Sequence, residues 1–195
     1  MAQQSVSSEA LMESLFEVFR CHGYEGTTLS QLSEVTGLQK SSLYHHFPEG
    51  KIDIVKAVLT YFSAQLYQHV IEPLLDSQKP PEKRFSNMLV TIKAFYSNGK
   101  KNCLLNALSL GEAKDEIKVL VSNDYNAWLD ALNKLGKEVG MARRDAEVWS
   151  ERFLIVVEGA LVVQRLTSNA LTFENTMDYE KKQFLKLCGL VTDKI

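Results

Sequence analysis

The sequence predicts an all-α protein of about nine helices. Apolar residues recur with a 3.6-residue period through most of its 195 residues. The four prolines and ten glycines fall mostly at the boundaries of these stretches, and strand-like alternation is poor throughout. A hydrophobic share of 45% is normal for a globular protein with a core.

The first helix is expected over residues 8–22, with Gly23 ending it. A helix-turn-helix follows. Thr28 has the chemistry of an N-cap, and Gln31 is placed to complete a capping box with it. Gly37 suits the turn, because glycine adopts positive φ at no steric cost.

The second helix of the motif is predicted over roughly residues 39–45. Apolar side chains at helical spacing are expected to face a small core, and these are Leu29, Leu32, Val35, Leu43 and Phe47. The opposite face carries an ammonium group, hydroxyls and imidazoles, which suit phosphate oxygens and base edges. Its outward residues are Gln39, Lys40, Ser41, Ser42 and Tyr44.

Over residues 9–60 the chain resembles the TetR family of bacterial transcriptional regulators. The resemblance rests on Gly23-Tyr24, Thr27-Thr28, Gly37, Leu43-Tyr44-His45-His46-Phe47 and Lys51. The spacing of Pro48-Glu49-Gly50-Lys51 resembles the LmrA/YxaF-like branch. The resemblance implies a homodimer that binds a double-stranded DNA operator.

The resemblance also implies roles for individual residues. Contacts with phosphates are implied for Thr28, Tyr44, His46 and Lys51. The positions that face base edges are Gln39, Lys40 and Ser41, with His45 in the same interface. The alternative for His46 is a structural hydrogen bond within this part of the chain.

The charge of this segment is unusual for a DNA-binding protein. Residues 1–60 hold four Lys or Arg and seven Asp or Glu, and the whole chain has a net charge of −2. Because phosphate neutralisation supplies most non-specific affinity, we predict weak non-specific binding with a shallow salt dependence. A helical protein-interaction module that has lost DNA binding is the alternative from another class.

The remaining residues, 51–195, are expected to form an effector-binding and dimerisation domain, beside a helix-turn-helix domain over residues 1–50. The first helix of this second domain is expected over residues 51–70, with Pro73 marking its end. We interpret it as the rigid connection that transmits movement between the two domains. After a loop at residues 76–81, further helices are expected over residues 82–97, 103–110, 115–137, 145–169 and 173–190.

The segment from Phe153 to Val163 is apolar nearly all round, and a helix of this kind must be covered on every side. A second copy of the chain is the simplest cover, and the resemblance also implies dimerisation through the last two helices. The expected interface comprises Phe153, Val156, Gly159, Ala160, Val163, Phe184 and Leu187.

The family builds its pocket for a small-molecule effector among the middle helices, and such pockets are largely apolar. The candidate lining residues are Phe62, Gln65, Leu66, Met88, Ile92, Tyr96, Cys103, Trp128, Phe153 and Val157. Cys103 follows two lysines, which favour a thiolate. It therefore also supports an alternative within the same class, a thiol-based redox sensor.

Several classes of function are not expected. No catalytic motif or phosphate-binding loop is present, and the four histidines are not spaced as metal ligands, so we expect no enzyme, cofactor or metal site. No run of about 18 apolar residues predicts a membrane span, and the N-terminus lacks the pattern of a secretory signal. An odd number of cysteines favours the cytoplasm. The sequence thus predicts a ligand-responsive transcriptional regulator, more specifically a repressor.

Overall fold

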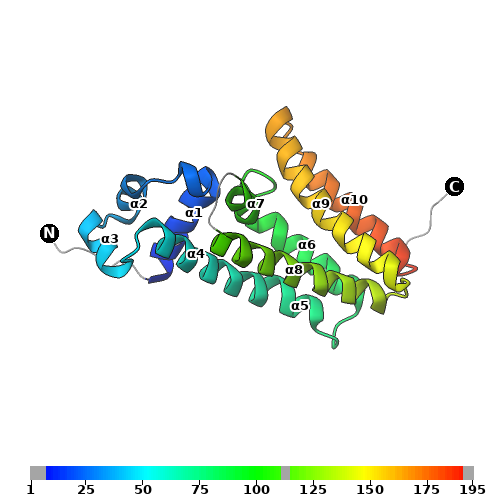
Figure 1. The fold of residues 1–195 in the computed structure, drawn as a ribbon. Coiled ribbons are helices and arrows are strands. Elements are labelled where there is room, and N and C mark those ends of the chain that lie inside the picture. Colours follow the sequence, from blue (N-terminus) through cyan, green and yellow to red (C-terminus); the bar gives the residue numbers. More distant parts are fainter. Residues whose placement is uncertain (1–7, 111–114, 191–195) are drawn as a thin grey trace. The chain divides into compact units, whose positions relative to one another are not determined.

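The computed structural model describes residues 8–110 and 115–190, and it confirms the all-α class for them. The expected helix boundaries agree with it to within a few residues, apart from the changes given below. The elements (Figure 1) are α1 (Ser8–Gly26), α2 (Leu29–Thr36), α3 (Lys40–His46), α4 (Lys51–Leu66), a π-helical turn (Tyr67–Ile71), α5 (Glu72–Leu75), α6 (Pro81–Phe95), α7 (Leu104–Ser109), α8 (Asp115–Glu138), α9 (Arg143–Thr167) and α10 (Thr172–Leu187).

The chain divides into two compact units. The first comprises residues 1–64 and 104–122, and the second comprises residues 65–103 and 123–195. The first unit therefore includes most of α4 as well as the helix-turn-helix. The division of function at residue 50 stays a prediction.

In the first unit, α1 packs against α7 and α2. A break inside α1 allows this packing: Gly23 has φ of 66°, and a Cβ there would lie 2.7 Å from the carbonyl oxygen of Ala107 in α7. Only glycine combines this backbone conformation with so close an approach. The core beneath includes Leu15, Phe19, Leu32, Leu43 and Ile54.

The helix after residue 51 is longer than expected. It does not end before Pro73 but continues through the π-helical turn and α5 to Leu75. Proline has no N–H to donate and its ring clashes with the carbonyl four residues earlier. The π-helical turn lies directly before this proline, and its wider hydrogen bonding is shown by the Glu72 N–H, which donates to the Tyr67 carbonyl five residues back.

In the second unit, α6, α9 and α10 enclose a cluster of aromatic rings. The Phe85 ring stacks on Phe184 at 4.2 Å between centroids and meets Phe153 edge-on at 5.3 Å. Phe153 and Phe184 are fully buried, and Ala160 is only 6% exposed. The expectation that these three residues contact a second copy is therefore wrong, because the protomer itself covers them.

The start of α10 is held by one buried amide. The Gln164 side chain donates to the Asn98 carbonyl and accepts from the Phe173 N–H, both at 2.8 Å. Gly99 passes so close that a Cβ there would lie 2.6 Å from Gln164 Nε2 and 2.5 Å from Phe173 Cβ. These contacts join the turn after α6 to both α9 and α10.

Candidate functional site

The helix-turn-helix is formed as its local sequence dictates. The Thr28 hydroxyl oxygen accepts a hydrogen bond from the Gln31 N–H at 3.3 Å, and the Gln31 side chain accepts from the Thr28 N–H at 2.8 Å. Gly37 has φ of 67°, and its N–H donates to the Glu34 carbonyl at 3.3 Å. The predicted capping box and glycine turn are thus confirmed. The same cap engages the Thr28 hydroxyl, which also donates to Gln31 Oε1 at 2.9 Å.

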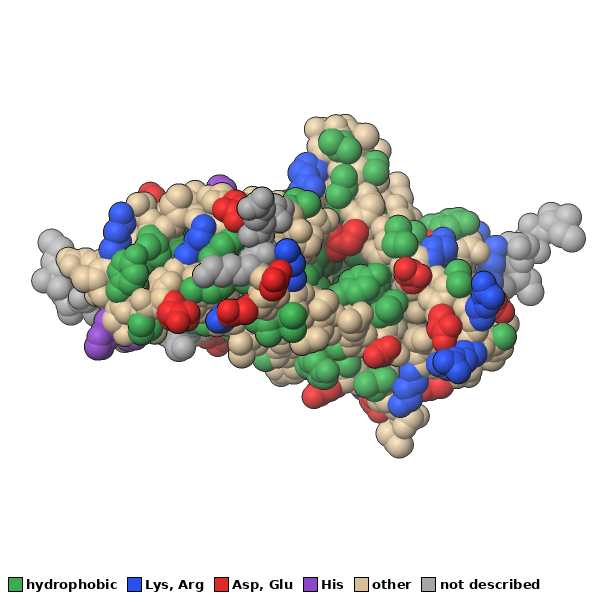
Figure 2. All heavy atoms as spheres, in the orientation of Figure 1, with side chains coloured by type: hydrophobic (Ala, Val, Ile, Leu, Met, Phe, Trp, Pro, Cys, Tyr) green, Lys and Arg blue, Asp and Glu red, His purple; other side chains and the backbone are tan. Residues whose placement is uncertain are grey.

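The second helix of the motif, α3, exposes most of its side chains (Figure 2) and buries Leu43. Seven of the eight predicted DNA-contacting residues are exposed, and Lys51 is half-buried; the exposed ones are Thr28, Gln39, Lys40, Ser41, Tyr44, His45 and His46. Val35 was expected in the core but is 46% exposed, because it lies on the outer side of the short helix α2. The structure therefore presents a polar surface, whose contacts with DNA stay a prediction.

Tyr44 is placed by the turn that begins α4. Its ring carbon Cε1 lies 3.2 Å from the position that a Cβ on Gly50 would occupy, and Gly50 is buried with φ of 66°. The first backbone N–H groups of a helix lack partners within it and carry partial positive charge. Tyr44 therefore holds a hydroxyl donor beside the N-terminus of α4, an arrangement suited to a phosphate oxygen.

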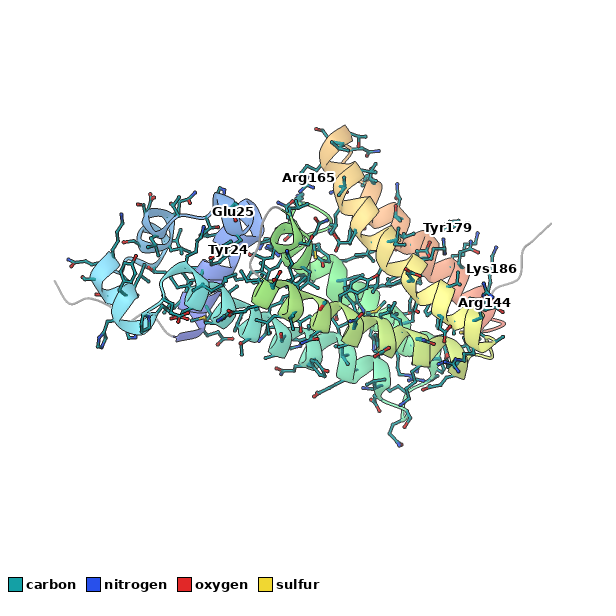
Figure 3. All side chains as sticks on the ribbon, in the orientation of Figure 1. Tyr24, Glu25, Arg144, Arg165, Tyr179 and Lys186 are labelled. Atoms are coloured by element: carbon teal, nitrogen blue, oxygen red, sulfur yellow. The ribbon has the colours of Figure 1, made fainter. Side chains whose placement is uncertain are left out.

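Lys51, which is expected to contact phosphates, also makes contacts within the protein. Its ammonium donates to the Tyr24 carbonyl at 2.8 Å and to the Thr27 carbonyl at 3.0 Å, and it lies 4.3 Å from the centre of the Tyr24 ring. Burial, with the nearby Glu25 carboxylate (Figure 3), raises the pKa of Tyr24. An ammonium group has three donors, so at most one remains for DNA. Nothing in the sequence distinguishes this structural role from phosphate binding.

The other cations of the first unit are also engaged. The Arg20 side chain is buried, stacks 4.9 Å from the centre of the Phe16 ring and pairs with Glu17 at 2.5 Å. Lys56 pairs with Glu116, and this hydrogen bond raises the pKa of Lys56. Within described residues 8–60, Lys40 alone among Lys and Arg is exposed with no such pairing.

The predicted effector residues are almost all interior. Gln65 is partly exposed, and the others are buried: Phe62, Leu66, Met88, Ile92, Tyr96, Cys103, Trp128, Phe153 and Val157. Phe62 lies in the first unit and stacks on Phe16 at 6.1 Å, whereas the rest lie in the second. The Trp128 indole N–H is buried without a hydrogen-bond partner, and such donors are rare in folded proteins.

Cys103 was expected to begin a short helix, but α7 begins one residue later, at Leu104. The Cys103 side chain is 5% exposed. Reactive cysteines are typically partly exposed as well as electropositive. The burial of Cys103 therefore gives the redox alternative no support.

The last two helices, α9 and α10, expose apolar side chains, as the sequence predicts for them. Of the predicted interface residues, Gly159, Val163 and Leu187 are exposed and Val156 is partly exposed. Sequence reasoning missed the larger part of this surface, namely Val148, Ile155, Leu166, Leu171 and Tyr179. We call all these exposed residues the α9–α10 outer face. The residues of this face that lie on α9 could have been found from the sequence. They are spaced three, four or seven residues apart, so they fall on the same side of a helix as Gly159.

Two classes of site receive no support within the described residues. No group of three or more His, Cys, Asp or Glu side chains is gathered as metal ligands. No described helix combines the length and the apolar character that crossing a membrane requires.

Comparison with known proteins agrees with the geometry of the helix-turn-helix. Residues 11–58 match the sequence model of the bacterial regulatory proteins of the tetR family. The chain is 22% identical over 167 residues to the uncharacterized regulator YxaF of Bacillus subtilis, covering 84% of this chain and 87% of the relative. It is 25% identical over 188 residues to the repressor KstR2 of Rhodococcus jostii, covering 91% and 86%.

Solved structures show the same fold. A TetR transcriptional regulator from Legionella pneumophila superimposes with a TM-score of 0.77 at 16% identity, over 94% of this chain and 99% of that one. The regulator TetR from Rhodobacter sphaeroides gives 0.77 at 18% identity, over 91% and 98%. The helix-turn-helix matches the family model, relatives align with most of the length of the chain, and solved structures share its fold. The chain therefore belongs to the TetR family of helix-turn-helix transcriptional regulators.

Proposed function

We propose that the chain is a homodimeric cytoplasmic repressor that binds operator DNA through α3 and is released by a small-molecule effector. The observation that carries the proposal is the exposed polar face of α3, held by the capped α2 and the Gly37 turn. A helix in this setting reads the major groove. The named repressors among its relatives, KstR2 and DhaR of Mycobacterium, support the direction of regulation.

In this proposal Tyr44 and the N-terminus of α4 hold a phosphate, while Gln39, Lys40 and Ser41 face base edges. His45 and His46 add imidazole donors at the C-terminal end of α3. Lys51 contributes mainly by holding the end of α1 against the start of α4, and its remaining donor adds a phosphate contact. Phosphate contacts fix the register on which base recognition depends.

A dimer matches the geometry of duplex DNA, since two recognition helices about 34–36 Å apart enter successive major grooves. The α9–α10 outer face supports such a dimer, because a monomer would leave this apolar surface in water. Residues 51–195 then act as the effector and dimerisation domain, and residues 1–50 as the DNA-binding domain.

An effector in the second unit lowers DNA affinity if it binds best to a conformation in which the two recognition helices no longer fit the grooves. A shift from 1:99 to 99:1 between the two states requires about 5.5 kcal/mol of differential binding. The unpartnered Trp128 N–H supports an effector that carries a hydrogen-bond acceptor. Native mass spectrometry of the purified dimer would detect an effector that co-purifies.

The DNA contact is tested with Tyr44→Ala and the matched control Tyr67→Ala. Both tyrosines are 48% exposed, but Tyr67 lies in the π-helical turn, away from α3 in the sequence. Anisotropy titration with the duplex upstream of the chain's own gene should show at least about tenfold weaker binding for Tyr44→Ala, the value of one lost charge-assisted hydrogen bond. Tyr67→Ala should bind as the unmodified protein does. Equal affinity of the two variants would remove Tyr44 from the interface.

A further inference from the structure

The exposed face of α9 is centred on one residue. With 100° per residue, Val148, Arg152, Ile155, Val163 and Leu166 all project within about 40° of the direction of Gly159. The residues on the opposite side, such as Phe153, Leu154, Val157 and Leu161, are buried in the protomer. A Cβ added at Gly159 would meet nothing within 4 Å, so the centre of this face is open.

The exposed side chains are arranged in pairs about Gly159. Ile155 and Val163 lie four residues before and after it, and Arg152 and Leu166 lie seven residues before and after it. At 1.5 Å per residue, the second pair lies about 10.5 Å from Gly159 in each direction. A twofold axis through Gly159 and perpendicular to α9 would therefore bring Arg152 of one protomer opposite Leu166 of its partner.

The two ends of the face differ in shape. At the Arg152 end, α9 and α10 form a groove of about 390 Å³ lined by Trp149, Arg152, Tyr179, Gln183, Lys186 and Leu187. At the other end, Leu166 is 77% exposed, the largest value among the described large hydrophobic side chains. Figure 2 shows hydrophobic side chains gathered where α9 and α10 meet at that end. One end is hollow and the other projects.

The groove is held in shape by contacts within the protomer. Arg152 pairs at 2.9 Å with Glu180, whose side chain is 3% exposed. The Trp149 ring stacks on Phe184 at 5.3 Å. Tyr179 and Lys186 lie along α10 at its rim (Figure 3). A groove with fixed walls costs little to order when a side chain enters it.

We propose that, in the homodimer of the proposed function, Leu166 of each protomer inserts into the groove of its partner. The twofold axis passes near Gly159, so the contact forms twice and each groove is complete only when the second copy fills it. Helices in four-helix bundles cross at about 20°, which separates the paired positions by only about 4 Å at this distance from the axis. The absence of a side chain at Gly159 permits the close approach that this crossing needs.

Disulfide trapping tests the pairing in a background with Cys21→Ser and Cys188→Ser. The combination of Leu166→Cys with Gln183→Cys should give a covalent dimer on mild oxidation, while each change alone should not. Gly159→Cys alone should also give a covalent dimer, because each copy faces itself at the axis. A covalent dimer from Leu166→Cys alone would overturn the proposal, since it would place the axis at that end.

A second measurement does not depend on disulfide geometry. Leu166→Asp should weaken dimerisation by about 100-fold or more, because each dimer loses two buried leucine side chains and must place two carboxylates in the grooves instead. The matched control is Val90→Asp on α6, where the side chain is 65% exposed and lies outside this face. Analytical ultracentrifugation gives both dissociation constants.

The outcomes separate this inference from the function on which it rests. An unmodified protein that is monomeric at all concentrations contradicts the homodimer. A stable dimer in which the double cysteine variant does not cross-link, or in which Leu166→Asp behaves as Val90→Asp does, contradicts the groove contact and leaves the homodimer intact.

Discussion

The salt dependence of DNA binding should be shallow and should depend on Lys40. Of the four Lys and Arg residues within positions 1–60, Arg20 is buried against Phe16 and Lys56 pairs with Glu116. Lys51 retains one donor at most. Each protomer therefore offers about two side-chain cations, and a dimer about four, so the slope of log K against log[salt] is about −3.6.

This slope predicts that affinity falls on the order of 100-fold between 50 and 200 mM salt. Lys40→Ala removes one cation from each protomer and should reduce the slope to about −1.8. The assay is fluorescence anisotropy with a labelled duplex at four or more salt concentrations. Lys134→Ala on α8, an exposed lysine of the second unit, is the control and should leave the slope unchanged.

The result that refutes this reasoning is a slope that corresponds to eight or more released counterions. Such a slope would mean that the cations seen in internal pairs leave their partners to reach phosphates. An unchanged slope in Lys40→Ala would instead remove Lys40 from the DNA interface while leaving the count of the other cations in place.

Three further substitutions have defined outcomes. Gly159→Arg should give a monomer mass in light scattering with unchanged urea unfolding of the protomer, because a Cβ there meets nothing; a dimer mass would place the interface elsewhere. Gly99→Ala should lower the free energy of unfolding in urea by about 2–4 kcal/mol, since its φ is 84° and the Cβ would overlap Gln164 and Phe173; a loss below about 1 kcal/mol would show that the turn yields. Lys51→Ala should destabilise the first unit by about 1–3 kcal/mol, measured by hydrogen exchange, because two backbone carbonyls lose their donor; unchanged protection would leave Lys51 a role in DNA binding alone.

The helix-turn-helix could be predicted from the sequence almost residue by residue. Its determinants are local. The Thr28 hydroxyl and the Gln31 side-chain amide form their hydrogen bonds within one helical turn, and the positive φ at the end of α2 needs only that residue 37 is glycine. The apolar periodicity of α3 also fixed which side Leu43 faces. Short-range hydrogen bonds and backbone preferences of this kind need no partner that is distant in the sequence.

The exposed face of the last helices could be predicted only in part. The apolar character of residues 153–163 indicated that more than one side is covered, but not which side the protomer covers. Phe153 and Phe184 turned inward because Phe85 and Trp149 supply aromatic partners there. The groove at Arg152 needs side chains from two helices, so no single periodic pattern contains it.

The sequence by itself determined the all-α class, the family motif and the polar face of α3, because these depend on neighbours within a few residues. Only the tertiary structure decided that Lys51 and Arg20 serve internal contacts and that Ile155 and Leu166 remain exposed. The physical reason is that an ammonium, a guanidinium or an apolar side chain has the same chemistry in either setting. Its role follows from the carbonyl, ring or helix that folding brings within reach.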